Sequence, residues 1–491
     1  GFLTNDGPGI VEEYAGASHG GRGGNSWSTS SSAVPYGSVS GPVSLGSGGG
    51  SVDGGTGGGA VKLVVANTIT ADGTISANGG KGIVGNGGGG AGGSVWIIAD
   101  AFAGSGSITA DGGGSYNAGG GGGGGRISLQ WTSGAGKRTF TGSISAKGGD
   151  GGWYGGNQEA GKHGTIYVPA GLWNELWNAT YPVNGDIALA PGTYGIAYLH
   201  ITNNATLECQ GDPNDGTDGS GVIINATTVT VDSGSAISAD GLGFWNDDGP
   251  GIGDTYAGAA HGGRGGNGWA SYLCGSTYGS LSAPLALGSG GRSATGGKGG
   301  GAVKLNVAGT LTVDGTVSAN AGDPAAQGTI NTGGSSGGSV WIVADAFAGS
   351  GSITAHGGEG INGGGGGGGG RISLAWTAGA GKRTFSGVIA AEGGARGGHS
   401  GTQEAGYPGT VYVLSNLWDE LWNATYPVNG DIALAPGTYN IQKLHVTNNA
   451  TLSCQGDYDG TPVEGSGVVI VSDDITIDAG AKITADGEGF G

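Results

Sequence analysis

The motif GTISANGG at residues 73–80 returns as GSITADGG at residues 106–113 and as GSISAKGG at residues 142–149. Between these copies lie runs such as AVKLVVA and SVWIIADA, which are rich in Val, Ile and Ala. Alternation of apolar and other side chains with a period of two indicates half-buried strands. Short strands that recur between Gly-rich turns predict an all-β solenoid. We expect a parallel β-helix whose turns hydrogen-bond to one another about 4.8 Å apart.

The whole pattern occurs twice along the chain of 491 residues. Residues 1–242 form one repeat unit and residues 243–488 form the second, so that Phe2 is matched by Phe244. Residues 489–491 repeat the opening of a unit, which predicts that the chain is a window cut from a longer array. Units this similar are typical of tandem duplication, and they favour a role that benefits from a long array of repeats.

Composition indicates an ordered chain. Gly supplies 124 residues and Pro 14, a level that without a collagen period is typical of disorder. However, 36% of the residues are hydrophobic, and there are 12 Trp and 16 Tyr. Chains that cannot bury a core lack such side chains. We therefore expect a folded, Gly-dense protein.

Charge disfavours several classes of partner. Lys and Arg number 18 against 37 Asp and Glu, a net charge of −19. Binding to nucleic acid or to anionic lipid requires clustered basic side chains. The best apolar run, residues 94–103, is interrupted by Asp100 and is shorter than the roughly 18 residues of a membrane helix. We expect no nucleic-acid partner, no membrane insertion in this segment and, because nucleotide and phosphate-loop motifs are missing, no cofactor.

Two kinds of segment depart from the strand pattern. The all-Gly tract at residues 119–125, matched by residues 364–370, is interpreted as a flexible loop. The alternative is an extended Gly helix packed against a neighbouring tract, an approach that only Gly permits. LWNELWNA at residues 172–179, matched by residues 417–424, has apolar residues three and four apart and is the stretch for which we consider a helix.

The repeats resemble a known kind of protein. The motif followed by GGGxGGSVWI is similar to the large Gly-rich repeat proteins of microbial cell surfaces. The segment GDIALAPGTYGIAYLHITNNATLECQG at residues 185–211 resembles right-handed parallel β-helices of the pectate-lyase-like and filamentous-haemagglutinin-like kind. The resemblance covers most of both repeats and implies secreted adhesins or structural fibres.

Some polar positions vary between the repeats. Asp111 is matched by His356, and Lys147 by Glu392. Because an active site would keep its carboxylates, these positions predict solvated turns.

Other polar residues are shared. His19 and Arg22 of HGGRGG recur as His261 and Arg264. Such a pair could contact a phosphate or a sugar, because Gly exposes backbone N–H groups and Arg binds anions. We favour the structural interpretation, in which the pair bonds to neighbouring carbonyl groups.

Shared carboxylates could belong to an enzyme. They are Glu159 with its counterpart Glu404, and Asp186 with its counterpart Asp431. None has a second carboxylate nearby in sequence to form an acid and base pair, although a β-helix brings distant turns together. We therefore expect no enzyme activity.

An acidic loop offers a candidate cation site. Flexible turns with several oxygen ligands suit calcium. The residues are Asp212, Asp215 and Asp218, with Asp457, Asp459 and Glu464 in the counterpart loop. Because the spacing is not kept, an ordinary acidic turn is favoured and the metal remains unknown.

Five Asn-X-Ser/Thr triplets are candidate glycan attachment points in a secreted protein. They are Asn178, Asn204, Asn225, Asn423 and Asn449. The alternative is chance occurrence in a Thr-rich β protein.

Three Cys residues are too few for a disulfide framework. Cys209 and Cys454 are one repeat apart. At roughly ten turns per unit this is on the order of 50 Å, too far for a disulfide. A bridge between Cys209 and Cys274 is an alternative, but we expect buried free thiols.

These observations predict an extracellular structural protein whose repeats stack into a filament, stalk or sheath, with itself as partner. The main rival is a surface adhesin rod that carries a binding tip elsewhere in the chain. A polysaccharide-acting enzyme is disfavoured because the aromatic pair Trp153 and Tyr154 is lost in the second repeat. Ice binding would need a regular Thr ladder, of which Thr68 and Thr70 are only a part.

Overall fold

The protein is a parallel β-solenoid of about 12 turns with 3% helix, which confirms the predicted fold class. Roughly ten turns per repeat was too many, because each turn contains a long Gly-rich excursion. Ile75, Ile108 and Ile144, for example, are in register on successive turns. The computed structural model describes the chain except residues 11–12, 27–32, 154–157, 294–295, 323, 325–330, 399–401, 424, 457–466 and 487–491, and the side chain of Ser271.

The chain divides into two compact units. Unit 1 contains Gly1–Cys209 and Gly234–Ile237, and unit 2 contains Gln210–Ser233, Ser238–Pro324 and Thr329–Gly491. The last part of the first sequence repeat therefore belongs largely to unit 2.

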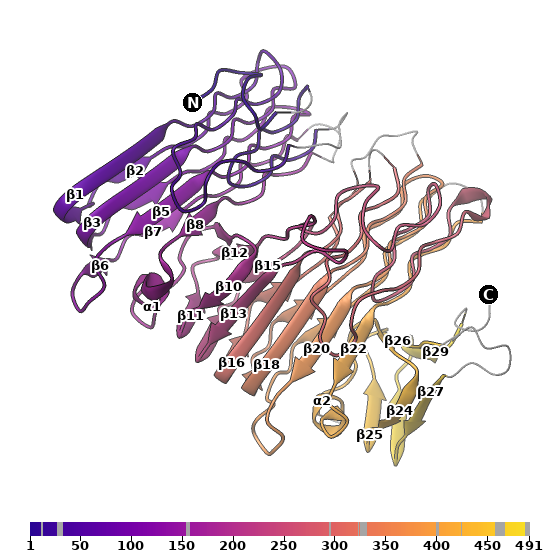
Figure 1. Cartoon of the computed structure of the whole chain (residues 1–491). Coiled ribbons are helices and arrows are strands. Elements are labelled where there is room, and N and C mark those ends of the chain that lie inside the picture. The colour runs from indigo at the N-terminus through magenta and orange to yellow at the C-terminus, as the bar shows by residue number, and fades with distance from the viewer. Residues whose placement is uncertain are drawn as a thin grey trace. The chain divides into compact units, whose positions relative to one another are not determined.

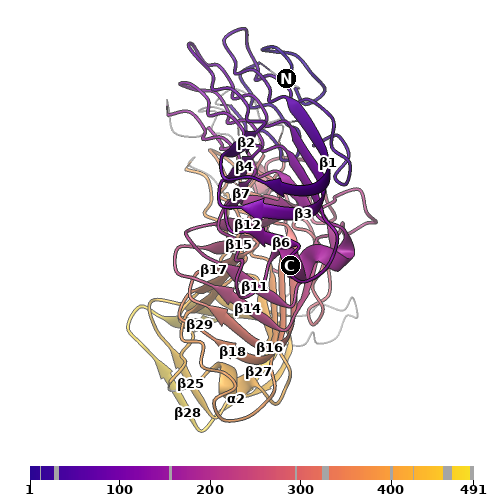
Figure 2. The ribbon, with the colours of Figure 1, turned by 90° about the vertical axis from the view of Figure 1, so that its left-hand side faces the viewer.

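Unit 1 consists of short strands joined by Gly-rich excursions. Its elements are β1 (Ala60–Thr70), β2 (Thr74–Ser76), β3 (Ser94–Gly104), β4 (Ser107–Thr109), β5 (Arg126–Gln130), β6 (Arg138–Phe140), β7 (Ser143–Ser145), β8 (Thr165–Tyr167), η1 (Ala170–Leu172), α1 (Trp173–Leu176), β9 (Ile187–Leu189), β10 (Gly192–Gly195), β11 (Tyr198–Ile201) and β12 (Thr206–Cys209). The main sheet has the order β1-β3-β5-β8-β9-β12 (Figure 1), and β2, β4 and β7 stack in a second sheet (Figure 2).

Unit 2 repeats this plan. Its elements are β13 (Val222–Ala226), β14 (Thr228–Val231), η2 (Trp269–Ser271), β16 (Ala302–Val313), β17 (Thr316–Ser318), β18 (Ser339–Ala348), β19 (Ser352–Thr354), β20 (Arg371–Ala375), β21 (Val388–Ala390), β22 (Thr410–Val413), α2 (Trp418–Leu421), β23 (Ile432–Leu434), β24 (Gly437–Asn440), β25 (Lys443–Val446), β26 (Thr451–Cys454), β27 (Val468–Val471), β28 (Asp474–Ile477) and β29 (Lys482–Thr484), while β15 (Ala236–Ser238) has residues in both units. The main sheet of unit 2 has the order β13-β16-β18-β20-β22-β23-β26-β29 (Figure 1).

Inward-facing aliphatic and aromatic side chains fill the core of each turn. On β3, Val95, Ile97 and Phe102 are buried, whereas the intervening Trp96 is half-exposed. Phe102 stacks on Phe140 with 4.5 Å between ring centroids. Burying such a side chain contributes about 1.5–3 kcal/mol, so the strands owe their stability to packing between turns.

The predicted helices are present and very short. In α1, Trp173 and Leu176 are buried, and Glu175 accepts a hydrogen bond from Trp131 Nε1 at 2.8 Å. In α2 the corresponding bond joins Trp376 to Glu420 at 2.7 Å. Because one helical turn is not stable alone, these contacts hold it in place. Across the part of the chain that the structure describes, no helix is long and apolar enough to cross a membrane.

The Gly tracts form an ordered bundle, so the flexible-loop interpretation of residues 119–125 was wrong. Successive N–H groups of this tract point to three different neighbours in rotation. The donors and acceptor carbonyls are Gly120 to Tyr14, Gly121 to Glu159, Gly122 to Gly113, Gly123 to Ala17, Gly124 to Lys162 and Gly125 to Ala110, at 2.6–3.0 Å. This three-residue period is that of an extended helix with three residues per turn and no internal hydrogen bonds.

Unit 2 contains the same bundle around residues 364–370. Its corresponding bonds join Gly365 to Tyr256, Gly366 to Glu404, Gly367 to Gly358, Gly368 to Ala259, Gly369 to Tyr407 and Gly370 to Ala355, at 2.7–2.9 Å. The bundle therefore belongs to the repeat and not to one copy of it.

Candidate functional site

A ladder of polar side chains runs along the turn motif in each unit. In unit 1, Asn78 Oδ1 accepts the N–H of Asp111 at 2.8 Å, and Asp111 Oδ1 accepts the N–H of Lys147 at 2.7 Å. Each side chain thus satisfies a backbone donor on the next turn. The sequence signal for this ladder is the polar residue after Ala in every motif, but its acceptor role was not recognised.

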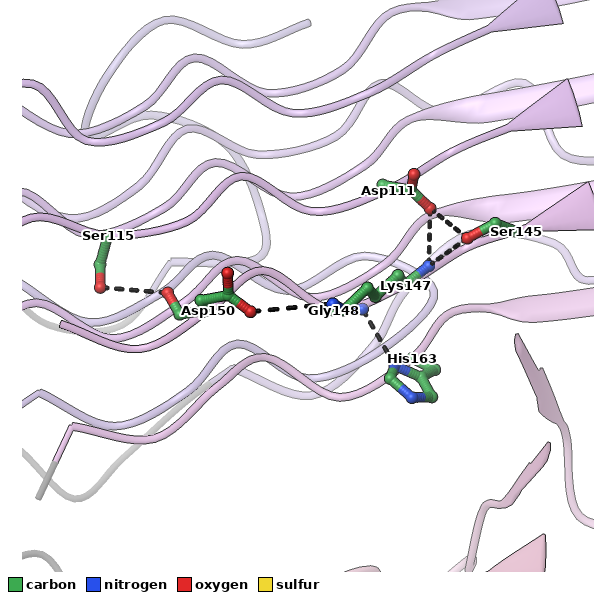
Figure 3. Close-up of polar contacts among 7 residues, drawn as sticks. All are labelled: Asp111, Ser115, Ser145, Lys147, Gly148, Asp150 and His163. Atoms are coloured by element: carbon green, nitrogen blue, oxygen red, sulfur yellow. Dashed lines mark hydrogen bonds and ion pairs between the residues drawn. The ribbon is translucent and has the colours of Figure 1, made fainter. Parts of the chain in front are cut away.

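Figure 3 shows the part of this ladder around Asp111 and Lys147. Asp111 Oδ1 also accepts the Ser145 hydroxyl at 2.7 Å, and the N–H of Gly148 donates to His163 Nδ1 at 3.0 Å. The Lys147 amino group lies 3.9 Å from Asp150, and both side chains are exposed. The acceptor atoms face backbone N–H groups and a hydroxyl, which is an arrangement for joining turns.

Unit 2 contains a corresponding ladder that is built from different residues. Asp240 accepts the N–H of Asn320 at 2.6 Å, Asn320 accepts that of His356 at 2.8 Å, and His356 Nδ1 accepts that of Glu392 at 3.0 Å. Burial lowers the pKa of His356, although the nearby carboxylates oppose this shift. The neutral ring suits its acceptor role. The variation from Asp111 to His356 therefore keeps an acceptor at the same place.

The shared histidines bond to carbonyl groups, as the structural interpretation expected. His19 Nδ1 donates to Gly92 O at 2.8 Å, and His261 Nδ1 donates to Gly337 O at 2.9 Å. Both rings are fully buried. Burial, together with a nearby guanidinium, lowers the pKa of His19 to about 4 and that of His261 to about 3.

The shared arginines lie in the Gly bundle. Arg22 is buried, and the Arg264 guanidinium lies 4.5 Å from the ring centre of Tyr407. A second pair, Arg126 and Arg371, escaped notice in the sequence, although the signal was an Arg kept before ISL in both repeats. Each donates to a backbone carbonyl at 2.8 or 2.9 Å and to a threonine hydroxyl at 2.9 or 3.0 Å.

The shared carboxylates also accept backbone N–H groups. Each bond links segments that are distant in sequence. The pairs are Glu159 with Asn25 at 3.3 Å, Glu404 with Asn267 at 3.5 Å, Asp186 with Thr206 at 2.8 Å and Asp431 with Thr451 at 2.6 Å.

The acidic loop does not converge on an ion. Asp212 pairs with Ser220 through backbone bonds of 2.8 and 3.0 Å, and its carboxylate accepts the N–H of Asn214 at 2.9 Å. Among the residues that the structure describes, no three His, Cys, Asp or Glu side chains are placed to hold a metal. The counterpart residues Asp457, Asp459 and Glu464 lie outside the described residues.

The candidate glycan sites fall into three settings. Asn178 and Asn423 donate their side-chain amides to backbone carbonyls of α1 and α2, at 3.0 and 2.6 Å. Asn204 and Asn449 are exposed in turns with φ of 56° and 57°. Asn225 is exposed on β13 and accepts a hydrogen bond from an amide on β16 at 2.8 Å. Glycan attachment stays a prediction, and the two exposed turns suit it best.

Other sequence candidates are placed as follows. Cys209, Cys274 and Cys454 are thiols, so the alternative bridge between Cys209 and Cys274 is wrong. The expected burial is confirmed for Cys209, whereas Cys274 and Cys454 are only half-buried. Trp153 is exposed, and Tyr154 lies outside the described residues. On the next turn, Ala101 and Ala103 stand opposite Thr68 and Thr70, so no Thr ladder forms there.

The repeat junction is the remaining candidate site, and it lies within unit 2. Strands β13 and β14, from the end of the first sequence repeat, pair in parallel with β16 of the second repeat. Val222 is opposite Val303, and Val229 is opposite Leu311. The junction core is 0–1% exposed and consists of Val222, Ile224, Val229, Val231, Val303, Leu305, Leu311 and Val313.

Comparison with known proteins adds no relative. No family model, curated protein or solved structure matches the chain.

Proposed function

We propose that the protein is an extracellular structural protein whose solenoid repeats stack into a filament, stalk or sheath. The observation that carries this proposal is the junction inside the chain. There the end of one repeat pairs strand to strand with the start of the next, and its inward side chains are buried. A repeat joined in this way extends the solenoid by the same packing that forms each turn.

Three further features support a structural role. Side chains shared by the two repeats, such as those of His19, Glu159 and Asp186, form hydrogen bonds to backbone groups of other segments and so hold those segments together. Charged residues are only 11% of the chain, which favours close packing between neighbouring solenoids. The resemblance to Gly-rich cell-surface proteins with right-handed β-helices points to an extracellular location.

Electron microscopy of the native assembly tests the proposal. About 12 turns for two repeats correspond to roughly 30 Å per repeat at about 4.8 Å per turn. We expect a continuous fibre with this axial repeat and a meridional signal near 4.8 Å. Isolated rods of finite length that carry a separate, non-repetitive head would contradict the proposal and favour the adhesin.

A further inference from the structure

Among the residues that the structure describes, the strands that correspond to the two sides of the repeat junction each have one edge without a paired strand. In sequence, β1 is the counterpart of β16, and β27 and β28 are the counterparts of β13 and β14. β1 pairs with β3 on one side, while β27 and β28 pair with β24 and β25. We call β1 the leading edge, and β27 with β28 the trailing edge.

Side chains at the two edges are more exposed than the corresponding side chains at the internal junction. On the trailing edge, Ile475 is 49% and Ile477 is 47% exposed, whereas their counterparts Val229 and Val231 are fully buried. Beside the leading edge, Leu45 is 38% exposed, whereas its counterpart Leu287 is fully buried. Apolar side chains on an unpaired strand edge are a template for another strand.

The two edges match each other in the register of the internal junction. Val468 corresponds to Val222 and Val61 to Val303, which are opposite each other inside the chain. The same register sets further apolar pairs, and Ile477 opposite Ala71 is one of them. The others are Ile470 opposite Leu63, Val471 opposite Val64, and Ile475 opposite Ile69.

One outward-facing position distinguishes the edges from the internal junction. Inside the chain, Asn225 is opposite Asn306, and their side chains hydrogen-bond at 2.8 Å. The counterparts at the edges are Val471 and Val64, which are 52% and 70% exposed. Both members of the pair change together from polar to apolar. Pairing an edge with an internal strand would set a Val against an Asn, so the edges suit each other best.

We propose that the trailing edge of one copy of this chain binds the leading edge of a second copy, in the register of the internal junction. This inference rests on the proposed function for its mode of stacking, and it adds the partner and the residues in contact. Because the two edges differ, the contact is head to tail and does not close on itself. Such a contact can be repeated from copy to copy and so produces filaments.

Sedimentation of the purified chain across the micromolar range tests this contact. We expect concentration-dependent oligomers that grow into filaments under the electron microscope. Ile475→Lys places a charge where the contact buries an apolar side chain, so association should weaken by at least about a hundredfold. The matched control is Leu414→Lys, which alters a Leu that is 48% exposed and directly follows β22, a strand that is paired on both sides.

Disulfide cross-linking tests the register separately. Adjacent strands lie about 4.8 Å apart, within the Cα separation that a disulfide tolerates. A chain carrying Val64→Cys and Val471→Cys should form a ladder of covalent oligomers on oxidation. A chain carrying Val64→Cys and Val469→Cys, which is two residues out of register, should not. The parent chain controls for its own three thiols.

Sedimentation and cross-linking test the contact and its register separately. A parent chain that stays monomeric, or equal weakening by both lysine variants, would overturn the proposed contact. Cross-linking of the Val469 pair as efficiently as the Val471 pair would overturn the register. A monomeric chain beside continuous native fibres would leave the stacking function standing and remove only the contact between copies.

Discussion

At the scale of single residues, the fold requires glycine at many positions because backbone oxygens occupy the space that a side chain would need. A Cβ on Gly120 would lie 1.9 Å from the carbonyl oxygen of Gly24, and a Cβ on Gly124 would lie 1.8 Å from that of Ala146. Such contacts cannot be relieved by a rotamer change. The bundle therefore needs Gly wherever its chains touch, which accounts for the composition of the protein.

Gly121→Ala tests this requirement. Its Cβ would meet the Gly149 carbonyl oxygen at 1.9 Å, and the residue also donates to Glu159 O. We expect a loss of about 3 kcal/mol or more in the free energy of unfolding, since the backbone must shift. Gly195→Ala is the control, because no atom lies within 4 Å of the added methyl group. Urea unfolding compares the two variants, and equal stability would refute a close-packed bundle.

The buried histidines make stability depend on pH. The pKa of His19 is about 4 in the fold and 6.5 in the unfolded chain, so the unfolded chain takes up the proton first. The contribution of His19 to the free energy of unfolding is fully present above pH 6.5. It is lost as the pH falls from 6.5 to 4, which lowers the free energy of unfolding by about 3 kcal/mol. His19→Gln keeps a donor for Gly92 O but does not titrate. Melting temperatures between pH 7 and pH 4.5 should fall less steeply for this variant than for the parent chain, and parallel slopes would contradict the assignment.

At the scale of elements, turns are joined by side-chain acceptors as well as by strands. Asp111→Ala removes the acceptor of the Lys147 N–H and of the Ser145 hydroxyl, so we expect a loss of about 1–3 kcal/mol in unfolding free energy. Asp111→His should lose less, because His356 fills this position in the second repeat. Lys147→Ala is the control, since it keeps the backbone donor. Urea unfolding that ranks the His variant below the Ala variant would contradict the acceptor role.

The Val pair of the two edges gives a second prediction at this scale. Val64→Asn or Val471→Asn alone sets Asn against Val and should weaken association a few-fold, since cross-strand pairs contribute about 0.2–1 kcal/mol. The double variant recreates the pair of Asn225 and Asn306 and should recover most of the affinity. Sedimentation equilibrium measures all three dissociation constants. A double variant weaker than either single variant would argue against direct contact.

Sequence patterns predict the strands well and the Gly tracts poorly, for a physical reason. The alternation in SVWIIADA is local, so β3 and its core residues Val95 and Ile97 follow from it. The tract at residues 119–125 has no pattern of its own. Its order depends on neighbours such as Tyr14 and Glu159, which only the folded chain brings together. The ladder of polar side chains was not predicted for the same reason, because its hydrogen bonds join residues that are one full turn apart in sequence.

At the scale of the whole molecule, the internal junction and the turns of the solenoid use the same interaction. Aliphatic side chains such as Ile224 and Leu305 are as buried at the junction as Ile97 is within unit 1. Addition of a repeat therefore requires no new type of surface. The same reasoning extends to the contact between two copies, because Ile470 and Leu63 occupy these positions at the edges.

Net charge opposes association of whole chains and makes it depend on salt. Each copy carries a charge of −19, so two copies repel at low ionic strength. The screening length falls from about 30 Å at 0.01 M to about 8 Å at 0.15 M ionic strength, while the apolar contact is not weakened. We expect the mean sedimentation coefficient at fixed concentration to rise over this range of NaCl. The Ile475→Lys variant should remain monomeric throughout, which separates the edge contact from general salting-out. A fall in association with salt would show that attraction between charges, and not apolar strand pairing, holds the copies together.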